Sequence, residues 1–274
     1  MTAQSHSKFA RTPTHPHRLQ IFAPTRRGKI KREATVETGT GWGTAVISGV
    51  LDQRHADLMD AARLVAEKIV QTADGRIHLL IDAARLRAAL GWRKTNYDRM
   101  RERIDDLLDA RVDLIIPARG ITVKGHIIDE AAEADISPPM RRCKPPLAEA
   151  RSPNDFGLRS GGMWRITWGR VWTTLTCHDL QTRYPLWVVL EMRHGISQAV
   201  ARHCFTHSNV NHPITGILSR VGAAGRCRDR IRELRSDEVI LCKAGIVITD
   251  THVIYTPSAS PVPVGASPVP VKPA

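Results

Sequence analysis

The sequence lacks the features that mark disulfide-rich, secreted and membrane-spanning proteins. Its five cysteines are an odd number with no Cys-x-x-Cys pair, which argues against a disulfide framework and against a zinc ribbon. The densest apolar run, Leu186 to Leu190, is five residues long, far short of the roughly 18 that cross a bilayer. The first 20 residues are polar and basic, unlike a secretory signal. We therefore expect a soluble, cytoplasmic protein with no membrane partner.

Acidic residues are scarce beside basic ones. Lys and Arg total 40 against 27 Asp and Glu, so the formal net charge is +13. Such a surplus is typical of proteins that bind a polyanion, most often nucleic acid. Few side chains in residues 1–40 could build a core, and we predict a mostly disordered basic arm there. This arm holds two acids, Glu33 and Glu37, and eight basic residues: Lys8, Arg11, Arg18, Arg26, Arg27, Lys29, Lys31 and Arg32.

Two further stretches have the composition of unfolded segments. Residues 257–274 repeat Ser-Pro-Val-Pro-Val, which predicts an extended, polyproline-like tail. Proline, glycine, serine and charge dominate residues 130–162, which predicts a linker. The rest of the chain divides into a first folded segment, residues 41–129, and a second, residues 163–256.

Apolar spacing and capping residues predict the elements of the first segment. We expect Asp82 to cap one helix that Gly91 ends, and Thr95 or Asn96 to cap the next. The expected elements are a helix over residues 53–70, a strand over 78–81, helices over 83–90 and 97–108, and a hairpin of strands 112–116 and 121–128.

The second segment predicts a similar order. Its expected elements are helices over residues 186–192 and 198–205, a short strand at 213–214, a helix through 217–218 that ends near Gly222, a helix over 224–237, and a hairpin of strands 239–241 and 246–255. Residues also match at a constant offset of 127, since Arg99-Met-Arg-Glu-Arg-Ile104 corresponds to Arg226-Cys-Arg-Asp-Arg-Ile231. The match continues from Leu107, Val112 and Leu114 to Leu234, Val239 and Leu241, and indicates two copies of one fold.

Helices, a short strand and a closing hairpin in this order are typical of a winged helix. In that helix-turn-helix variant the third helix enters the major groove of DNA and the hairpin, or wing, touches the backbone. We therefore predict an α+β protein with two tandem winged-helix domains. Arginine suits guanine edges and asparagine suits adenine edges, whereas wing residues would contact phosphates.

Helix geometry then selects the candidate DNA contacts. In the first segment Met100, Ile104 and Leu107 face inward, and in the second Cys227, Ile231 and Leu234 do so, which leaves a basic flank on each helix. Each arginine could instead belong to a solvated helix face with ion pairs four residues apart. The candidates are Thr95, Asn96, Arg99 and Arg103 on the first helix, Arg226 and Arg230 on the second, and Arg119, Lys124 and Lys243 on the wings.

Enzymatic readings find less support in the residues. No Gly-x-x-x-x-Gly-Lys-Ser/Thr motif occurs, so a P-loop ATPase is not indicated. His15-Pro-His17 loosely resembles the paired histidines of metal-dependent nicking endonucleases, for which the chain offers Tyr97, Tyr184 and Tyr255 as nucleophiles. His203 and His207 share one helix face and could in principle hold a metal, although polar histidines at a helix end are the simpler interpretation. We expect no catalytic residue, no metal and no cofactor.

The sequence resembles the TrfA-type plasmid replication initiators, within the tandem winged-helix Rep proteins. The resemblance covers about residues 41–129 and 163–256. It implies binding to repeated origin sites (iterons), opening of an adjacent AT-rich region, recruitment of host replication proteins including a helicase, homodimerisation and no covalent chemistry. The residues that carry it are Gly49-Val-Leu-Asp-Gln53, Asp57-Leu-Met-Asp-Ala61, Leu86 to Gly91, Tyr97 to Leu107, Tyr184-Pro-Leu-Trp187 and Ile217 to Leu241.

We therefore expect a protein that binds specific double-stranded DNA at repeated origin sites and initiates plasmid replication. A transcriptional repressor or partition regulator of the same fold remains an alternative, because DNA binding is common to both. A metal-dependent DNA nickase is the second alternative.

Overall fold

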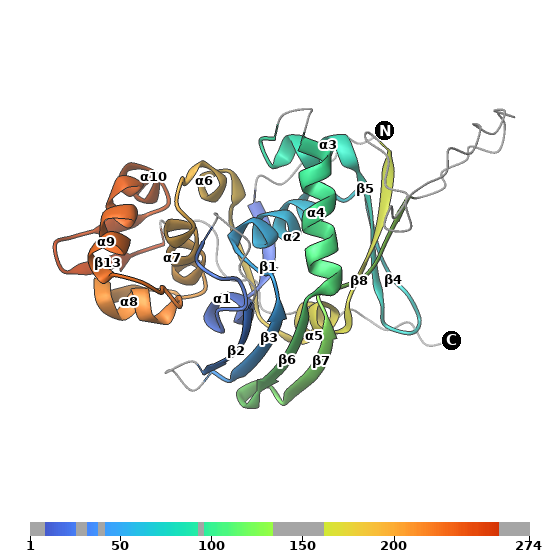
Figure 1. Ribbon diagram of the computed structural model, residues 1–274, viewed down its shortest axis with the longest axis horizontal. Helices are drawn as coiled ribbons and strands as arrows, with labels where there is room; N and C mark the ends of the chain where they lie inside the picture. Colours follow the sequence, from blue (N-terminus) through green and yellow to red (C-terminus); the bar gives the residue numbers. More distant parts are fainter. Residues whose placement is uncertain (1–8, 26–31, 38–41, 93–95, 134–161, 258–274) are drawn as a thin grey trace, which may run out of the picture.

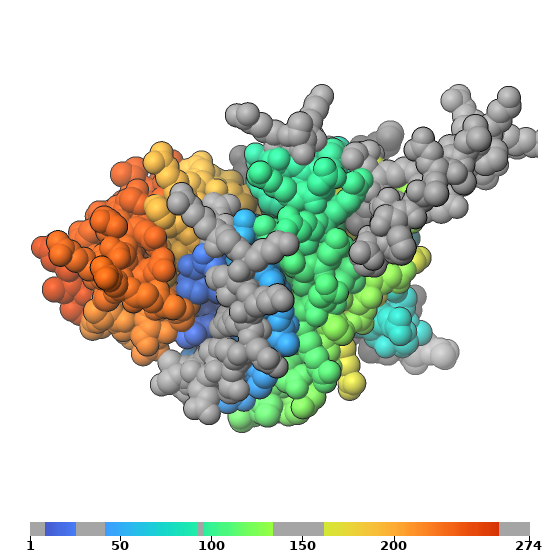
Figure 2. Space-filling view, viewed as in Figure 1, coloured from blue at the N-terminus to red at the C-terminus, as the bar shows by residue number. Residues whose placement is uncertain are grey.

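Two hydrophobic cores divide the protein into two domains. The computed structural model describes residues 9–25, 32–37, 42–92, 96–133 and 162–257. We take residues 9–185 as the first domain and residues 186–255 as the second, with the helix over residues 186–191 contributing side chains to both cores. In Figure 1 the second domain lies beside the larger first domain, and Figure 2 shows its orange residues as a lobe at one end of the molecule. Helices packed on small antiparallel sheets make this an α+β protein, as predicted.

The first domain holds two four-stranded sheets and a two-stranded ribbon. The sheet orders are β2-β3-β6-β7 and β4-β5-β9-β8, and the ribbon is β1-β10. The elements are β1 (Phe9–Pro13), α1 (His15–Arg18), β2 (Arg32–Glu37), β3 (Thr44–Gly49), α2 (Gln53–Val65), β4 (Lys68–Gln71), β5 (Ile77–Asp82), α3 (Ala83–Ala89), α4 (Tyr97–Asp109), β6 (Arg111–Ile116), the 3-10 turn η2 (Pro117–Arg119), β7 (Ile121–His126), β8 (Ile128–Glu133), β9 (Met163–Trp168), α5 (Arg170–His178) and β10 (Gln181–Pro185).

Local signals fixed several of these elements correctly. Asp82 caps α3, as predicted, because its carboxylate accepts hydrogen bonds from the backbone N–H groups of Ala84 (2.7 Å) and Arg85 (3.2 Å). Gly91, at φ +67°, ends that helical region. The predicted helix and hairpin that follow are α4 and the β6–β7 pair. The helix predicted over residues 53–70 ends at Val65 instead, since the β-branched Ile69 and Val70 form strand β4.

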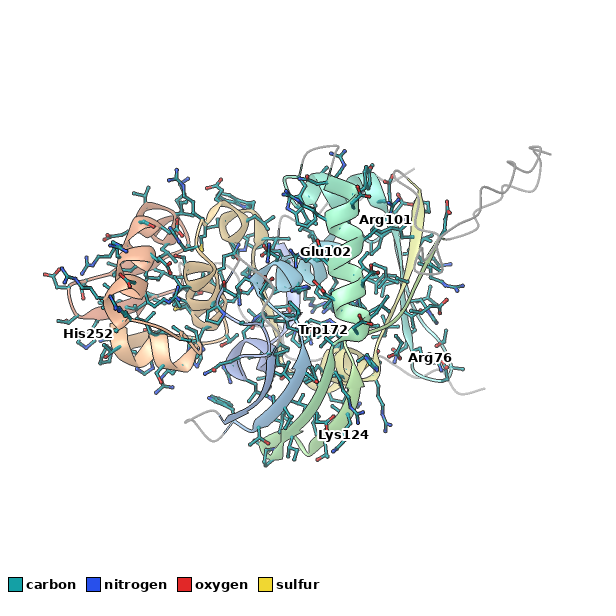
Figure 3. The ribbon with its side chains drawn as sticks, in the orientation of Figure 1. Arg76, Arg101, Glu102, Lys124, Trp172 and His252 are labelled. Carbon is teal, nitrogen blue, oxygen red and sulfur yellow. The ribbon has the colours of Figure 1, made fainter. Side chains whose placement is uncertain are left out.

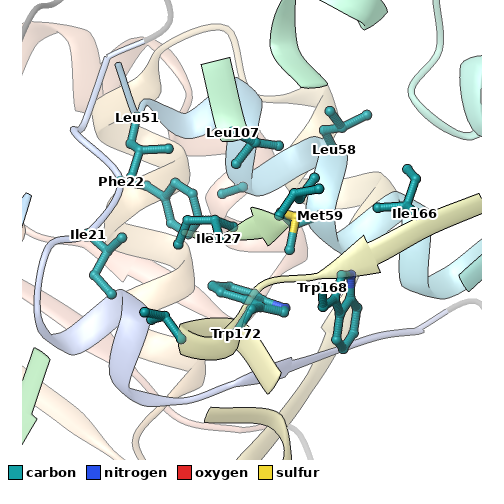
Figure 4. Packing of buried hydrophobic residues seen from close by; sticks show 14 of the residues in the cluster. Ile21, Phe22, Leu51, Leu58, Met59, Leu107, Ile127, Ile166, Trp168 and Trp172 are labelled. Atoms are coloured by element: carbon teal, nitrogen blue, oxygen red, sulfur yellow. The ribbon is translucent and has the colours of Figure 1, made fainter. Parts of the chain in front are cut away.

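Aromatic and aliphatic side chains from distant parts of the chain fill the core of the first domain (Figure 4). Trp172 of α5 meets both Phe22 and Trp168 edge to face, at ring centroid distances of 5.9 and 6.4 Å. Helix α4 contacts β7 of one sheet and β8 of the other. The core therefore holds the two sheets in one body.

The basic arm predicted over residues 1–40 is folded where the structure describes it. Strand β1 pairs with β10, β2 pairs with β3, and Leu19, Ile21 and Phe22 are buried in the first core. The prediction failed because it weighed the net charge of the segment above its alternating and clustered apolar residues. Residues 1–8, 26–31 and 38–41 lie outside the described residues.

The predicted linker and the boundary at residue 163 also need correction. Residues 128–133 form β8, which pairs with β9, and residues 134–161 lie outside the described part of the chain. Trp164, Trp172 and Tyr184 belong to the first core, so β9, α5 and β10 complete the first domain. The boundary falls in the helix that follows β10, whose Leu186 and Val189 belong to the first core and whose Val188 belongs to the second. The predicted tail, residues 257–274, lies beyond the described residues except for Pro257.

The second domain packs helices against a three-stranded antiparallel sheet of order β11-β13-β12. Its core includes Val200, Ile217, Leu234, Leu241 and Val253. The elements are α6 (Leu186–Glu191), α7 (Gly195–Phe205), β11 (Val210–Pro213), α8 (Ile214–Arg220), α9 (Cys227–Ser236), α10 (Glu238–Lys243), β12 (Ile246–Ile248) and β13 (His252–Tyr255). Among the described residues, no helix is both long and apolar enough to cross a bilayer.

The two domains do not repeat one sheet topology. In the second domain the strand before α8 joins the closing hairpin, whereas in the first domain β5 pairs with β4 and β9 and the β6–β7 hairpin pairs with β3. The strand predicted at residues 239–241 is part of helix α10. A three-residue apolar run cannot distinguish strand from helix, and here Leu241 is buried while Val239 is 75% exposed.

A buried polar network joins the domains. The guanidinium of Arg202 in α7 donates to Asp57 (2.7 Å), to Asp60 (3.1 Å) and to the side-chain oxygen of Gln53 (2.7 Å), all in α2. The hydroxyl of Tyr184 in β10 donates a hydrogen bond to Asp60 and accepts one from Arg202 Nε at 3.1 Å. Since an unpaired buried charge is costly, this network fixes α7 against α2.

Candidate nucleic-acid interface

Helix α9 presents a basic surface on the second domain. Gly222 and Gly225 adopt φ +71° and +97° between α8 and α9, a conformation that side chains with a Cβ rarely tolerate. Leu234 is buried, whereas Ile231 is only partly buried and Cys227, expected to face inward, is exposed. The arginines of this region are Arg226, Arg228, Arg230, Arg232 and Arg235, against two acids, Asp229 and Glu233.

The arginines at the beginning of α9 are the ones available for a ligand. Arg226 and Arg228 are exposed, and within the described residues neither side chain has a hydrogen bond or an ion pair. Arg232 is 81% exposed and pairs with Asp229 at 3.1 Å. The helix N-terminus adds a partial positive charge at the same end. This end of α9 therefore suits a phosphate or a guanine edge.

The other arginines of the region have structural partners. Arg230, a predicted DNA contact, donates to the Ala224 carbonyl (2.8 Å) and pairs with Glu233 (2.7 Å). Arg235 donates to the carbonyl of Thr249, between β12 and β13, at 3.0 Å. Their guanidinium groups brace the loop before α9 and the short hairpin, so we expect them to contribute less to binding than Arg226.

The predicted wing residue Lys243 does not lie on a hairpin. It is the last residue of α10 and pairs with Glu191 of α6 at 3.2 Å. The hairpin that does exist, β12–β13, turns at residues 249–251, and His252 lies just after that turn, at the end of the molecule in Figure 3. Lys243 was misplaced because residues 239–241 were interpreted as a strand.

Helix α4 of the first domain differs sharply from α9. Arg103, a predicted contact, is buried and pairs with Asp106 at 3.1 Å, and Arg101 pairs with Asp98 at 3.1 Å. Burial and the neighbouring acids raise the pKa of Asp105, which indicates a crowded negative field. With five acids and three arginines in the helix, most of α4 would repel a nucleic-acid backbone.

Only the beginning of α4 retains candidate DNA contacts that the sequence predicted. Arg99 is exposed and, in the part of the chain that the structure describes, has no side-chain partner. Asn96 is the N-cap residue, but its half-buried side chain makes no capping hydrogen bond. Thr95 lies outside the described residues. The structure thus brings Asn96 and Arg99 to one helix end and separates them from Arg103.

The first-domain hairpin carries Arg119 and Lys124, as predicted. Arg119 is exposed in the 3-10 turn η2, where it lines a shallow depression with Thr122 and His178. Lys124, 66% exposed, pairs with Asp113 at 3.0 Å across β6–β7. In Figure 3 Lys124 lies at the lower edge of the first domain, and His252 lies at the far end of the second domain.

Several side chains considered for nicking or for a metal are buried, namely His15, His17, His203 and Tyr184. His15 Nδ1 lies 2.5 Å from Asp179, and both side chains are buried. His17 is buried beside Tyr184, whose hydroxyl bonds Asp60, and burial lowers the pKa of His17 well below 6.5. Burial likewise lowers the pKa of His203 to about 3. Among the described residues, no group of three His, Cys, Asp or Glu side chains could hold a metal ion.

Sequence reasoning missed Arg228 and Arg232 on α9. The helical wheel placed Cys227 in the core, but this residue is exposed because the first turn of α9 extends past the core. Only Leu234 anchors this helix fully, so the exposed arc is wider than the usual amphipathic pattern predicts. The density of arginine in residues 226–235 was the signal that could have identified both residues.

Comparisons with known proteins identify the fold and no family. No protein-family model matches the chain, and neither does a curated protein. Among solved structures the chain is similar to domains 2 and 3 of RctB, with a TM-score of 0.58 and 11% sequence identity, over 89% of this chain and 98% of that chain. A second crystal structure of RctB domains 2-3 gives a TM-score of 0.49 and 13% identity, over 86% of this chain and 93% of that one. At this identity the similarity shows that both described domains share the fold of RctB domains 2 and 3.

Proposed function

We propose that this chain is a replication initiator of the tandem winged-helix type that binds repeated origin sites in double-stranded DNA, as the TrfA-type plasmid initiators do. RctB, whose domains 2 and 3 share the fold, is a replication initiator. The similarity spans both domains rather than one common module. The net charge of +13 agrees with a polyanionic partner.

The second domain supports a winged-helix interpretation most directly. Helix α7, strand β11, helices α8 and α9, and the β12–β13 hairpin follow the winged-helix order, and β11 pairs with the last strand of the hairpin. Helix α10 is an addition between α9 and the hairpin. In this scheme α9 is the recognition helix that enters the major groove.

The observation that carries the proposal is the exposed arginine set at the beginning of α9. Arg226 and Arg228 extend without partners in the described residues, beside the mostly exposed Arg232. Arg226 at the N-cap is the best placed for a guanine O6/N7 pair, since recognition helices contact base edges with their N-terminal residues. Arg228 and Arg232 would neutralise flanking phosphates.

We assign the first domain a supporting role on DNA. Its α4 is too acidic to lie along a groove, but Asn96 and Arg99 at one end, with Arg119 on the hairpin, could contact the backbone. The network around Arg202 would hold this domain at a fixed angle to α9, so that both meet one site. Recruitment of a host helicase and homodimerisation are parts of the same proposal.

The proposal includes no covalent catalysis. Incubation of supercoiled plasmid with the protein and Mg²⁺ or Mn²⁺ tests this directly, because a nickase would relax the DNA and the proposal expects supercoils to persist. A Tyr97→Phe variant is the control for any relaxation, because it lacks the hydroxyl of the least buried of the three tyrosines considered.

A replication assay separates an initiator from a repressor or partition regulator of the same fold. The gene and its flanking DNA are cloned into a vector whose own origin does not function in the host. The resulting plasmid should replicate there. The Arg226→Ala, Arg228→Ala double variant should not support replication. If the wild-type protein binds the DNA that flanks its gene and represses a reporter but never supports replication, the initiator assignment is wrong.

A further inference from the structure

The β1–β10 ribbon holds two arginines face to face. In its antiparallel register Arg11 of β1 lies directly opposite Arg183 of β10. Both side chains are exposed, whereas the residues on either side along the strands, among them Ala10 and Tyr184, are buried. Alternation along the strands therefore aims both guanidinium groups out of the same face of the ribbon.

A third arginine reaches this face from helix α2. Arg63 donates from Nη1 to the side-chain oxygen of Gln181, at 2.8 Å, and Gln181 is two residues from Arg183 on the same side of β10. The Arg63 guanidinium also lies 5.6 Å from the ring centre of Trp168. Burial, with the positive charge of Arg11 as the next cause, lowers the pKa of Arg63 to about 10. Arg63 and Arg11 are therefore close enough to repel each other.

The buried Asp60 attracts Arg63 but is itself paired with Arg202, so it offsets the charge of this face only in part. Arg11 and Arg183 make no ion pair or side-chain hydrogen bond within the described residues, and Arg63 uses one donor for Gln181. Like charges directly opposite each other on a strand pair are destabilising. Three converging guanidinium groups with spare donors are the arrangement that binds phosphate bidentately.

We propose that Arg11, Arg183 and Arg63, here called the arginine ribbon, form a phosphate-binding site for the backbone of double-stranded DNA. This inference rests on the proposed DNA-binding function and adds a contact surface outside α9. The ribbon contacts α2 through β1 and α7 through β10. In Figure 1 β1 lies in the middle of the molecule, between α7 and α4. A phosphate there would connect the DNA to the junction of the two domains.

The test is the salt dependence of DNA binding by the full chain. The Arg11→Gln, Arg183→Gln variant is compared with wild type on a duplex of native flanking DNA and on a random duplex of equal length. Each lost phosphate contact lowers the slope of log K against log salt by about 0.9. We expect the slope to fall by about two, with roughly tenfold or greater loss of affinity at 0.1 M salt, equally on both duplexes.

A matched variant controls for net charge. Arg76→Gln with Arg85→Gln removes two positive charges that are already paired, with Asp74 at 3.1 Å and Glu67 at 3.0 Å, and should keep the wild-type slope. Arg11→Lys with Arg183→Lys should retain most of it. If the double glutamine variant does not fold, the two single variants are used, each with an expected decrease of about one.

The possible outcomes separate this inference from the proposed function. If the glutamine variant keeps the wild-type slope while Arg226→Ala weakens binding, the arginine ribbon does not bind DNA and the inference is wrong. If the control variant lowers the slope as much as the ribbon variant, only net charge matters and the inference is again wrong. Failure of the wild-type protein to bind any duplex would instead refute the proposed function.

Discussion

Helices α4 and α9 carry nearly the same run of residues and present opposite surfaces. Both contain three arginines at alternate positions followed by isoleucine, with one acid between the second and third. In α4 the run continues into Asp105, Asp106 and Asp109, and both sheets pack close to the helix. In α9 only Leu234 is fully buried. The shared motif thus becomes an acidic, packed helix in one domain and a basic, exposed helix in the other.

The difference shows that a short sequence motif does not determine the surface that a helix presents. Arg103 and Arg230 are equivalent in the repeat, yet one is buried against Asp106 and the other braces the loop before α9. Their neighbours in the fold decide which donors remain for a ligand. DNA binding by the two helices can therefore be compared only while the two domains keep a fixed arrangement.

The largest effect is expected when the contact that joins the two domains is removed. Arg202→Met leaves Asp57 and Asp60 buried without their cation, and should lower the free energy of unfolding by about 3–5 kcal/mol. Urea denaturation with a tryptophan fluorescence readout measures the change. Arg232→Met breaks only an exposed pair and should cost under about 1 kcal/mol. Similar losses in both variants would show that the network does not join the domains.

Acid should destabilise the protein through two histidines at the junction. The pKa of His203 is lowered to about 3 and that of His17 well below 6.5, in both cases chiefly by burial. Below pH 6.5 the unfolded chain therefore binds more protons than the folded one, and stability falls by about 1.4 kcal/mol per pH unit for each histidine. Urea midpoints between pH 7.5 and 4.5 measure this slope.

His203→Leu isolates one of these contributions. Neither ring nitrogen of His203 has a hydrogen-bond partner in the described residues, so leucine should remove the His203 share of the acid slope, about 1.4 kcal/mol per pH unit. His55 of the first domain should behave oppositely. Burial opposes its proton, but hydrogen bonds with Asp106 and Asp52 raise the pKa of His55. Its stabilising contribution is complete below pH 6.5 and is lost as pH rises through the raised value. An unchanged acid slope in His203→Leu would contradict the assignment.

On DNA, Arg226→Ala should separate α9 from α4. A bidentate guanine contact contributes about 1–3 kcal/mol of discrimination, so this variant should lose affinity for the cognate site more than for random DNA. Arg99→Ala in α4 should weaken both equally and by less, as expected for a phosphate contact. Fluorescence anisotropy titrations on both duplexes measure the losses. Equal loss on both duplexes for Arg226→Ala would reduce that residue to a phosphate contact.

The smallest effect is expected at Lys243. It pairs with Glu191 on the surface, far from the expected role on a wing, so Lys243→Ala should change stability by under about 1 kcal/mol. DNA affinity should stay within twofold of wild type in the same titrations. A loss as large as that of Arg226→Ala would return Lys243 to the interface.

The sequence predicted the elements that local signals control. The Asp82 cap, the Gly91 helix end, helix α4, the β6–β7 hairpin and the charge surplus all follow from nearby residues. Sheet partners did not follow, because pairing depends on contacts distant in sequence. Strand β1 finds β10 about 170 residues away, and β5 finds β9 across the predicted linker. The folded arm and the later domain boundary were lost for this reason.

The candidate site was predictable only in part. Helix periodicity found Arg226 and Arg99, whose exposure depends on one helix face. It failed for Arg103 and Lys243, because burial against Asp106 and membership of α10 depend on tertiary packing. The pairing of Arg11 with Arg183 could not be predicted without the register of two strands far apart in sequence.

The most direct test of DNA binding through α9 is a gel-shift titration on native flanking DNA, with random competitor and a salt series. Wild-type protein should give several discrete bands that survive competitor and 0.15 M salt. Those bands should disappear when Arg226, Arg228 and Arg232 are all changed to Ala, and should persist when Arg99 and Arg101 are. A smear that vanishes as salt rises, or equal binding by the α9 triple variant, would contradict sequence-specific binding through α9.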